Sequence, residues 1–222
     1  SPLPYTRIKV LNESDATKIQ ARGNIASLNY ALYDEYKTKY DSTKNSCYSG
    51  LFMSCKSLIK APDLVATSLS KSCYMYMFKG CTNLKYIKCD ATDISASNCT
   101  FEWVRSVAST GDFYTPASTA WSSGISGIPS GWTRHDINPD PPTPPDPPTP
   151  PEPEKPDLDT FDPNVPFCIE NVGDVPVEIG MYDVTSNIRN SCEISYNNKD
   201  WFIYDLAVDP NPSDIKKIKL SN

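Results

Sequence analysis

The chain contains the same pattern of residues twice in succession, and this repeat limits the possible folds more than any other feature. NSCYSGLFMSCKSLIKAPDLVATSLS is followed directly by KSCYMYMFKGCTNLKYIKCDATDISA. The two copies align without a gap from the Cys47/Cys73 pair to the Leu58/Leu84 pair, at a period of 26 residues. A period of roughly 20 to 50 residues indicates a solenoid, in which each unit buries its apolar face against its neighbours.

The first half of each unit predicts a short helix and the second half a short strand. Cys47, Leu51 and Cys55 follow one another at four-residue intervals, which places them on one face of a helix, and the second copy repeats the spacing. SLIKAPDL and NLKYIKCDA alternate over a few positions, and Pro62 excludes a helix interior, so these segments favour strands. A third, decayed unit begins at Asn98, with FEWVRSVAS as its helix and GDFYTPAS as its strand.

The coinciding positions are the expected core of the stack. We expect the core to be held by Cys47, Phe52, Cys55, Leu58, Cys73, Phe78, Cys81 and Leu84. Cysteines at the same phase of stacked units favour rows of small buried side chains, so we expect free thiols. Cys47 and Cys55 would lie about 12 Å apart on a helix, too far for a disulfide. Bridges between neighbouring units, or between Cys168 and Cys192, stay open as alternatives.

The repeat motif and the segment that closes it resemble a known family. The pattern C-Y-x-x-M-F-x-G-C-T-x-L at residues 73–84, the following ATDISASNCT and the closing SGIPSGWT at 126–133 resemble the BspA-like leucine-rich repeats of gut anaerobic bacteria and their phages. The match covers roughly residues 45–135. It implies a small right-handed solenoid on a cell or virion surface, with binding rather than catalysis as its usual role. The chain differs from the family in having only about two and a half units, which would shorten any concave binding face.

Composition divides the chain into four predicted segments with an overall α+β fold class. These are an N-terminal cap or attachment segment at 1–44, the leucine-rich-repeat solenoid at 45–136, a proline-rich acidic linker at 137–164, and a small β-rich domain at 165–222.

The linker also divides the charge. Residues 1–138 hold 15 Lys and Arg against 11 Asp and Glu, whereas residues 139–222 hold 6 against 16. Between residues 139 and 156, 11 of 18 residues are proline, which predicts a polyproline II rod of about 55 Å that keeps two domains apart. A docking ligand with PxxP motifs is the alternative interpretation.

The two ends of the chain give weaker patterns. TRIKVLN suggests a strand, and Ile25, Leu28, Leu32 and Tyr36 lie on one side of a predicted helix over about 24–40, which suits the terminal unit that closes a solenoid. An attachment segment for a larger assembly is the rival hypothesis. FCIENV, PVEIGMYDV, CEISYNN and DWFIYDLAV predict a small antiparallel sheet or Ig-like sandwich.

Residues able to do chemistry are few, and we expect no metal, no cofactor and no enzyme activity. The chain lacks C-x2-C, and its single histidine is His135. His135, beside Asp136, is the sole imidazole able to activate a cysteine nucleophile, and we interpret it as a solvated residue at the end of the solenoid. Paired carboxylates of a glycosidase remain possible, although the acids gather in the linker and turns.

Positive charge gives a further hypothesis, which we do not favour. Lysines lie along both repeat units and would form a stripe suited to nucleic acid; they are Lys56, Lys60, Lys79, Lys85 and Lys88. The excess of positive charge in this half is small and no arginine cluster accompanies it, so we expect a solvated face and no nucleic-acid partner. No run of about 18 apolar residues predicts a membrane span, and SPLPYTRIKV has no secretory-signal pattern.

Together with what the resemblance implies about location, these patterns predict a non-catalytic extracellular protein that displays its repeat domain on a stiff linker. The resemblance implies a fibre-like phage virion appendage, which we favour, or a bacterial surface adhesin. Partners would be a protein or glycan on a bacterial surface, other virion proteins, or further copies of the chain. The expected ligand-binding residues are Lys60, Asp63, Lys85, Tyr86 and Lys88.

Two alternatives remain. A carbohydrate-binding accessory module of a polysaccharide-degrading system would need an exposed aromatic platform from Trp103, Trp121, Trp132 or Trp201. A pure assembly or cement role is the other.

Overall fold

The computed structural model describes residues 7–28, 38, 40–137, 167–175, 177, 179–182, 191–195, 202–205 and 217–220. The rod predicted at 139–156 lies outside these residues. So does most of the helix predicted at 24–40, including Leu32 and Tyr36; its start is the 3-10 helix η1 (Ile25–Leu28).

Short strands make up most of the regular structure. They are β1 (Arg7–Val10), β2 (Ile19–Arg22), β3 (Leu58–Lys60), β4 (Tyr86–Lys88), β5 (Asp112–Pro116), β6 (Thr133–Ile137), β7 (Cys168–Asn171), β8 (Ile179–Tyr182), β9 (Ser191–Ser195), β10 (Phe202–Asp205) and β11 (Lys217–Leu220). The strands predicted from SLIKAPDL, NLKYIKCDA, GDFYTPAS and TRIKVLN are therefore confirmed, as β3, β4, β5 and β1.

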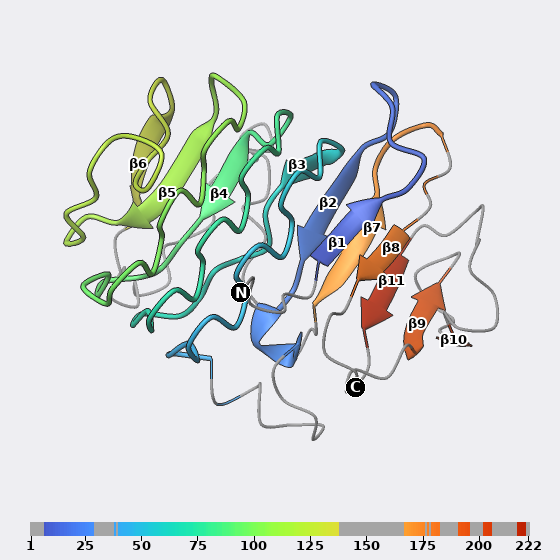
Figure 1. The fold of residues 1–222 in the computed structure, drawn as a ribbon, viewed down its shortest axis with the longest axis horizontal. Coiled ribbons are helices and arrows are strands. Elements are labelled where there is room, and N and C mark those ends of the chain that lie inside the picture. Colours follow the sequence, from blue (N-terminus) through green and yellow to red (C-terminus); the bar gives the residue numbers. More distant parts are fainter. Residues whose placement is uncertain are drawn as a thin grey trace, which may run out of the picture.

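Among the described residues the strands form a nine-stranded sheet and a separate pair. The order in the large sheet is β10-β9-β11-β7-β2-β3-β4-β5-β6, and β1 pairs with β8. Strands β2 to β6 run parallel, one from each successive coil, whereas the pairs from β2–β7 outward are antiparallel. Figure 1 shows the parallel strands side by side in sequence order, with β7 beside β2. Of the strands predicted for residues 165–222, those observed as β7, β9 and β10 thus continue the sheet of the solenoid, whereas β8 pairs with β1 outside it.

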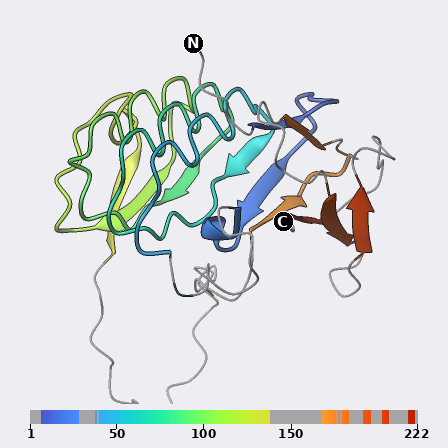
Figure 2. The ribbon, with the colours of Figure 1, turned by 60° about the horizontal axis from the view of Figure 1, so that its bottom comes forward.

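The helices predicted within the repeat units are wrong, because these segments are stacked turns. Every second N–H donates to the next coil: Tyr48 to the Cys73 carbonyl at 3.0 Å, and Tyr74 to the Cys99 carbonyl at 2.8 Å. The intervening N–H groups bond within their own coil, as Leu51 does to the Tyr48 carbonyl at 3.2 Å. Figure 2 shows these turns stacked on the side of the molecule opposite the parallel strands.

A four-residue period in the backbone explains the error. In the second unit Ser72, Tyr76 and Gly80 have positive φ values of 56°, 59° and 80°. A left-handed residue at every fourth position ends an α-helix before it can propagate, yet it returns apolar side chains to one side at the same spacing as a helix does.

The fold class is therefore almost entirely sheet and turn, and the predicted α+β solenoid with helices is corrected. In the part of the chain that the structure describes, no helix has both the length and the apolar character needed to cross a membrane.

Aromatic side chains run through the stack and fill its core. Phe78 lies between Phe52 and Trp103, with ring centroids 5.9 and 6.1 Å away, and Trp103 stacks on Trp121 at 5.5 Å. Of the eight residues expected in the core, Cys47 is half-buried and the other seven have no exposed surface. Contacts between rings of successive coils hold the coils in register.

The N-terminal end of the solenoid is closed by two segments that are distant in the chain. β1 continues the turn stack, since the Ile8 N–H donates to the Leu51 carbonyl at 2.7 Å, and β2 continues the sheet. β7 and β8 then pair with β2 and β1, and Phe167 is buried against Phe52 with ring centroids 6.2 Å apart. This end of the solenoid is thus closed by β1 and β2 together with β7 and β8, which follow the linker in the sequence.

Candidate recognition surface on the exposed face of the sheet

The exposed face of the parallel sheet follows from strand alternation. In β4 and β5 the side chains of Ile87 and Phe113 are buried in the core. Their neighbours Tyr86, Lys88 and Tyr114 are half-buried on the opposite face. Because one strand comes from each coil, this face presents one outward row of side chains across successive coils.

Four of these side chains touch in sequence, and we call them the tyrosine row: Lys60, Tyr86, Tyr114 and His135. Lys60 Nζ lies 5.0 Å from the centroid of the Tyr86 ring. The rings of Tyr86 and Tyr114 lie 5.0 Å apart, and Tyr114 stacks on His135 at 4.5 Å with an interplanar angle of 14°. Asp112 closes the row, since its Oδ1 is 2.8 Å from His135 Nε2.

The stacking determines which groups a partner can reach. Lys60 Nζ lies over the Tyr86 ring, the Tyr86 and Tyr114 rings contact each other at an angle of 34°, and Tyr114 stacks on His135. Each ring is therefore engaged with its neighbours in the row, and the polar groups that the row offers to a partner are the hydroxyls, the ammonium group and the imidazole. Such groups suit hydrogen bonding to a polar partner.

The structure brings together part of the predicted ligand-binding set. Lys60 and Tyr86 are in contact within the row, and Lys88 lies on the same face two residues after Tyr86. Lys85 is exposed just before β4, and Asp63 is half-buried after β3, so neither belongs to the row.

Tyr114 and His135, which belong to the row, and Asp112, which closes it, were not among the predicted ligand-binding residues. His135 is on the terminal strand of the parallel sheet, as its expected place at the end of the solenoid implies, but it stacks on a tyrosine and pairs with a carboxylate. The alternation of side chains in DFYTP and TRHDI could have identified them. If both segments are strands that pair in parallel, Tyr114 lies beside His135.

Charges flank the row toward β2 and β7. Glu170 accepts a hydrogen bond from Gln20 Nε2 at 2.6 Å and lies 3.6 Å from Arg22. Beyond β4, burial raises the pKa of Asp90, with Lys88 acting in the opposite direction. The face thus carries charges of both signs.

The lysines of the predicted stripe lie on different sides of the molecule. Lys60 and Lys88 face outward from the sheet. Lys79 lies on the turn side, where its Nζ is 2.7 Å from Glu102 and 4.6 Å from the centroid of the Tyr76 ring.

The buried cysteines have the wrong electrostatics for nucleophilic chemistry. Cys55, Cys73, Cys81, Cys89 and Cys99 are buried free thiols. Burial raises the pKa of both Cys55 and Cys73 to about 11, so the unreactive thiol form dominates at neutral pH. The alternative bridge from Cys168 to Cys192 involves a side chain outside the described residues. Among the residues that are described, no group of three His, Cys, Asp or Glu side chains is placed to hold a metal ion.

The three tryptophans in the described part of the chain pack in or against the core. Trp103 is fully buried and donates from Nε1 to the Gly127 carbonyl at 2.9 Å. Trp132 is 8% exposed and donates to the Ala108 carbonyl, and Trp121 is half-buried on Trp103. Trp201 lies outside the described residues.

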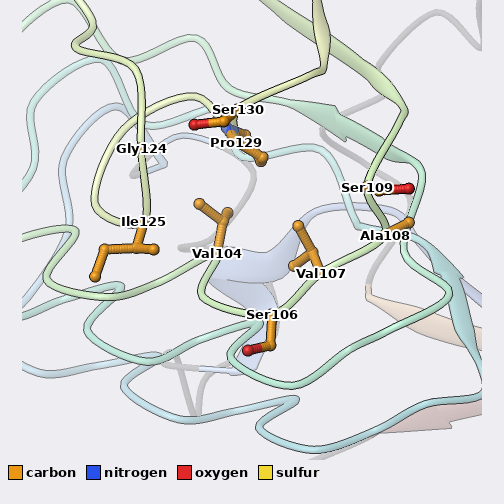
Figure 3. A pocket seen from close by; sticks show the side chains of 9 residues that line it. All are labelled: Val104, Ser106, Val107, Ala108, Ser109, Gly124, Ile125, Pro129 and Ser130. Carbon is orange, nitrogen blue, oxygen red and sulfur yellow. The ribbon is translucent and has the colours of Figure 1, made fainter.

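A pocket of about 160 Å³ lies among the loops of the last coil. Figure 3 shows its lining, in which Val104, Val107, Ile125 and Pro129 supply the apolar walls. The polar side chains around it are serines, without a neighbouring acid or base in the lining.

Comparison of the chain with protein-family models, curated proteins and solved structures gave no match.

Proposed function

We propose that the protein is a non-catalytic extracellular recognition and structural protein whose binding surface is the exposed face of the parallel sheet. The tyrosine row carries the proposal. Four side chains from four successive strands touch on a partly exposed face, although none of them contributes to the core.

The biological setting of the proposal comes from the repeat pattern. The BspA-like resemblance implies display on a virion or a bacterial surface, and we favour a fibre-like phage appendage over a bacterial adhesin. Its partner would be a bacterial surface protein or glycan, or another virion protein.

A carbohydrate-binding accessory module is the second candidate, and the described residues give it little support. Glycan modules stack sugar rings on open aromatic faces. Here Trp103 and Trp132 are buried, and the rings of Tyr86 and Tyr114 contact each other and their neighbours Lys60 and His135.

The test measures binding of the fluorescently labelled protein to intact cells of gut anaerobic bacteria. Tyr86→Ser together with Tyr114→Ser should weaken binding at least tenfold, because both hydroxyl-bearing rings leave the face. The matched control is Tyr76→Ser with Phe101→Ser, an edge-to-face pair 5.6 Å apart on the turn side, which should leave binding unchanged.

Equal losses in the two double variants would contradict the assignment of the sheet face. Unchanged binding in the Tyr86/Tyr114 variant would contradict it as well. Thermal unfolding of all three proteins checks that the comparison is made between folded molecules.

A further inference from the structure

The segment after the linker completes the solenoid by contacts that do not depend on chain connection. β7 pairs with β2 over four residues, from Ile19 opposite Asn171 to Arg22 opposite Cys168. β8 pairs with β1 over four more. Two edges of the N-terminal segment are thus covered by strands that arrive from elsewhere in the chain.

Side chains make this docking specific. Phe167 has no exposed surface, and its N–H donates to Ser27 Oγ at 3.0 Å. Ile169 and Ile179 are 2% and 5% exposed within the same core cluster. Without the docked segment, the end coil would expose apolar side chains and unpaired strand edges, both of which favour association.

The connection to this segment is far longer than the distance it must cover. Ile137 ends β6, and Cys168 lies opposite Arg22 at the C-terminal end of β2, so β6 ends and β7 begins at the same end of the parallel strands. Five strand spacings separate β6 from β7, or about 24 Å. The 29 residues between Ile137 and Phe167 could reach about 100 Å if extended.

The composition of the linker disfavours docking of residues 167–182 on the β1–β2 end of the same copy. The predicted polyproline rod of residues 139–156 would be about 55 Å long, more than twice the gap. Effective concentration is highest when the length of a connector matches the span and falls for longer or stiffer connectors. The β1–β2 end of a second copy can then compete for the docked segment.

We propose that residues 167–182 dock on the β1–β2 end of a second copy of the chain as well as on their own, so that copies become linked by strand exchange. Every contact in the docked interface is the same in both arrangements, and the 29 residues between Ile137 and Phe167 are long enough for both. The partner for this surface is therefore another molecule of the same protein. This inference is independent of the proposed sheet-face function.

The test shortens the linker in the otherwise complete chain and measures native mass by light scattering. Deletion of residues 138–163 leaves three residues between Ile137 and Phe167, which reach at most about 15 Å. Docking within one copy is then impossible, and we expect dimers or larger oligomers. A matched variant with Gly and Ser in place of residues 138–166, at the original length, should shift toward monomer relative to the natural chain.

A folded, monomeric deletion variant would overturn the proposal. A second measurement applies if that variant does not fold: two intact chains with different affinity tags are unfolded together, refolded at about 100 μM and captured through one tag. Recovery of the second tag, reduced when both chains carry the Gly and Ser linker, supports exchange. Recovery of the captured tag alone overturns it.

Discussion

Phe167 packs against Phe52 with ring centroids 6.2 Å apart, although the two residues lie on opposite sides of the proline-rich linker in the sequence. The contact joins the first repeat coil to the strand that returns after the linker. It makes the end of the solenoid dependent on a segment that is not part of the repeat, and it gives the first prediction.

Phe167→Ala should destabilise the protein by about 3 to 5 kcal/mol, the usual cost of truncating a fully buried phenylalanine. Denaturant unfolding of the intact chain measures this cost. Val172→Ala is the control, because Val172 is 39% exposed and follows the same strand. Equal, small effects of the two substitutions would show that β7 does not cover the end coil in solution.

Phe78→Ala tests the stacked core at its centre. Phe78 is fully buried between Phe52 and Trp103, so we expect a loss of about 3 to 5 kcal/mol and a much lower melting temperature. Phe101→Ala, at a side chain that is 41% exposed on the turn side, should change stability by less than about 1 kcal/mol. An unchanged melting temperature for Phe78→Ala would rule out the stacked core.

The buried thiols predict a loss of stability in alkaline solution. Burial raises the pKa of Cys55 in the folded protein from 9.0 to about 11. The stabilising contribution is complete below pH 9 and is lost as the pH rises toward 11, because the unfolded chain releases this proton first. At pH 10 the loss should be about 1 kcal/mol for this thiol.

Unfolding measured at pH 8 and pH 10 separates this effect from other titrations. The Cys55→Ala variant has no thiol at this position and should lose less stability between the two pH values than the natural protein. The same slope in both proteins would mean that Cys55 titrates normally.

Gly111→Ala should destabilise the junction between β4, β5 and the closing segment. A Cβ atom at this position would lie 2.6 Å from the Lys85 carbonyl oxygen and 2.8 Å from the Trp132 ring, so backbone or ring must move. Crowding of this kind costs about 1 to 3 kcal/mol. Denaturant unfolding, with tryptophan fluorescence as the signal, measures the change.

Thr110→Ala, at the exposed neighbour, is the control for Gly111→Ala and should have little effect. A Gly111→Ala protein as stable as this control would contradict the close approach of Trp132 to the backbone.

The sequence predicted the repeat and its short strands because both depend on local pattern. Ile87 and Phe113 are inward residues of strands that alternation identifies within a few positions. The helices failed for a physical reason. The four-residue spacing of Cys47, Leu51 and Cys55 is common to a helix and to a run of turns with a left-handed residue at every fourth position, and hydrogen bonds between coils select the turns.

The candidate site was predicted only in part. Lys60, Tyr86 and Lys88 lie in the predicted strands of the two clear repeat units, so they were expected among the exposed strand and loop residues. Tyr114 and His135 belong to the decayed third unit and the closing segment, where the repeat no longer gives a register. Their place in the row depends on the parallel pairing of β5 with β6.

The sequence by itself determined a stacked repeat with a period of 26 residues, its buried positions and the composition of the linker, since these follow from residue types at fixed local spacing. Tertiary structure alone decided that the coils bond to one another through turns, that Tyr114 meets His135, and that Phe167 closes the end beside Phe52. These three features depend on contacts between residues far apart in the chain. Local periodicity does not predict such contacts, because the free energy that selects them comes from burial and backbone pairing between coils.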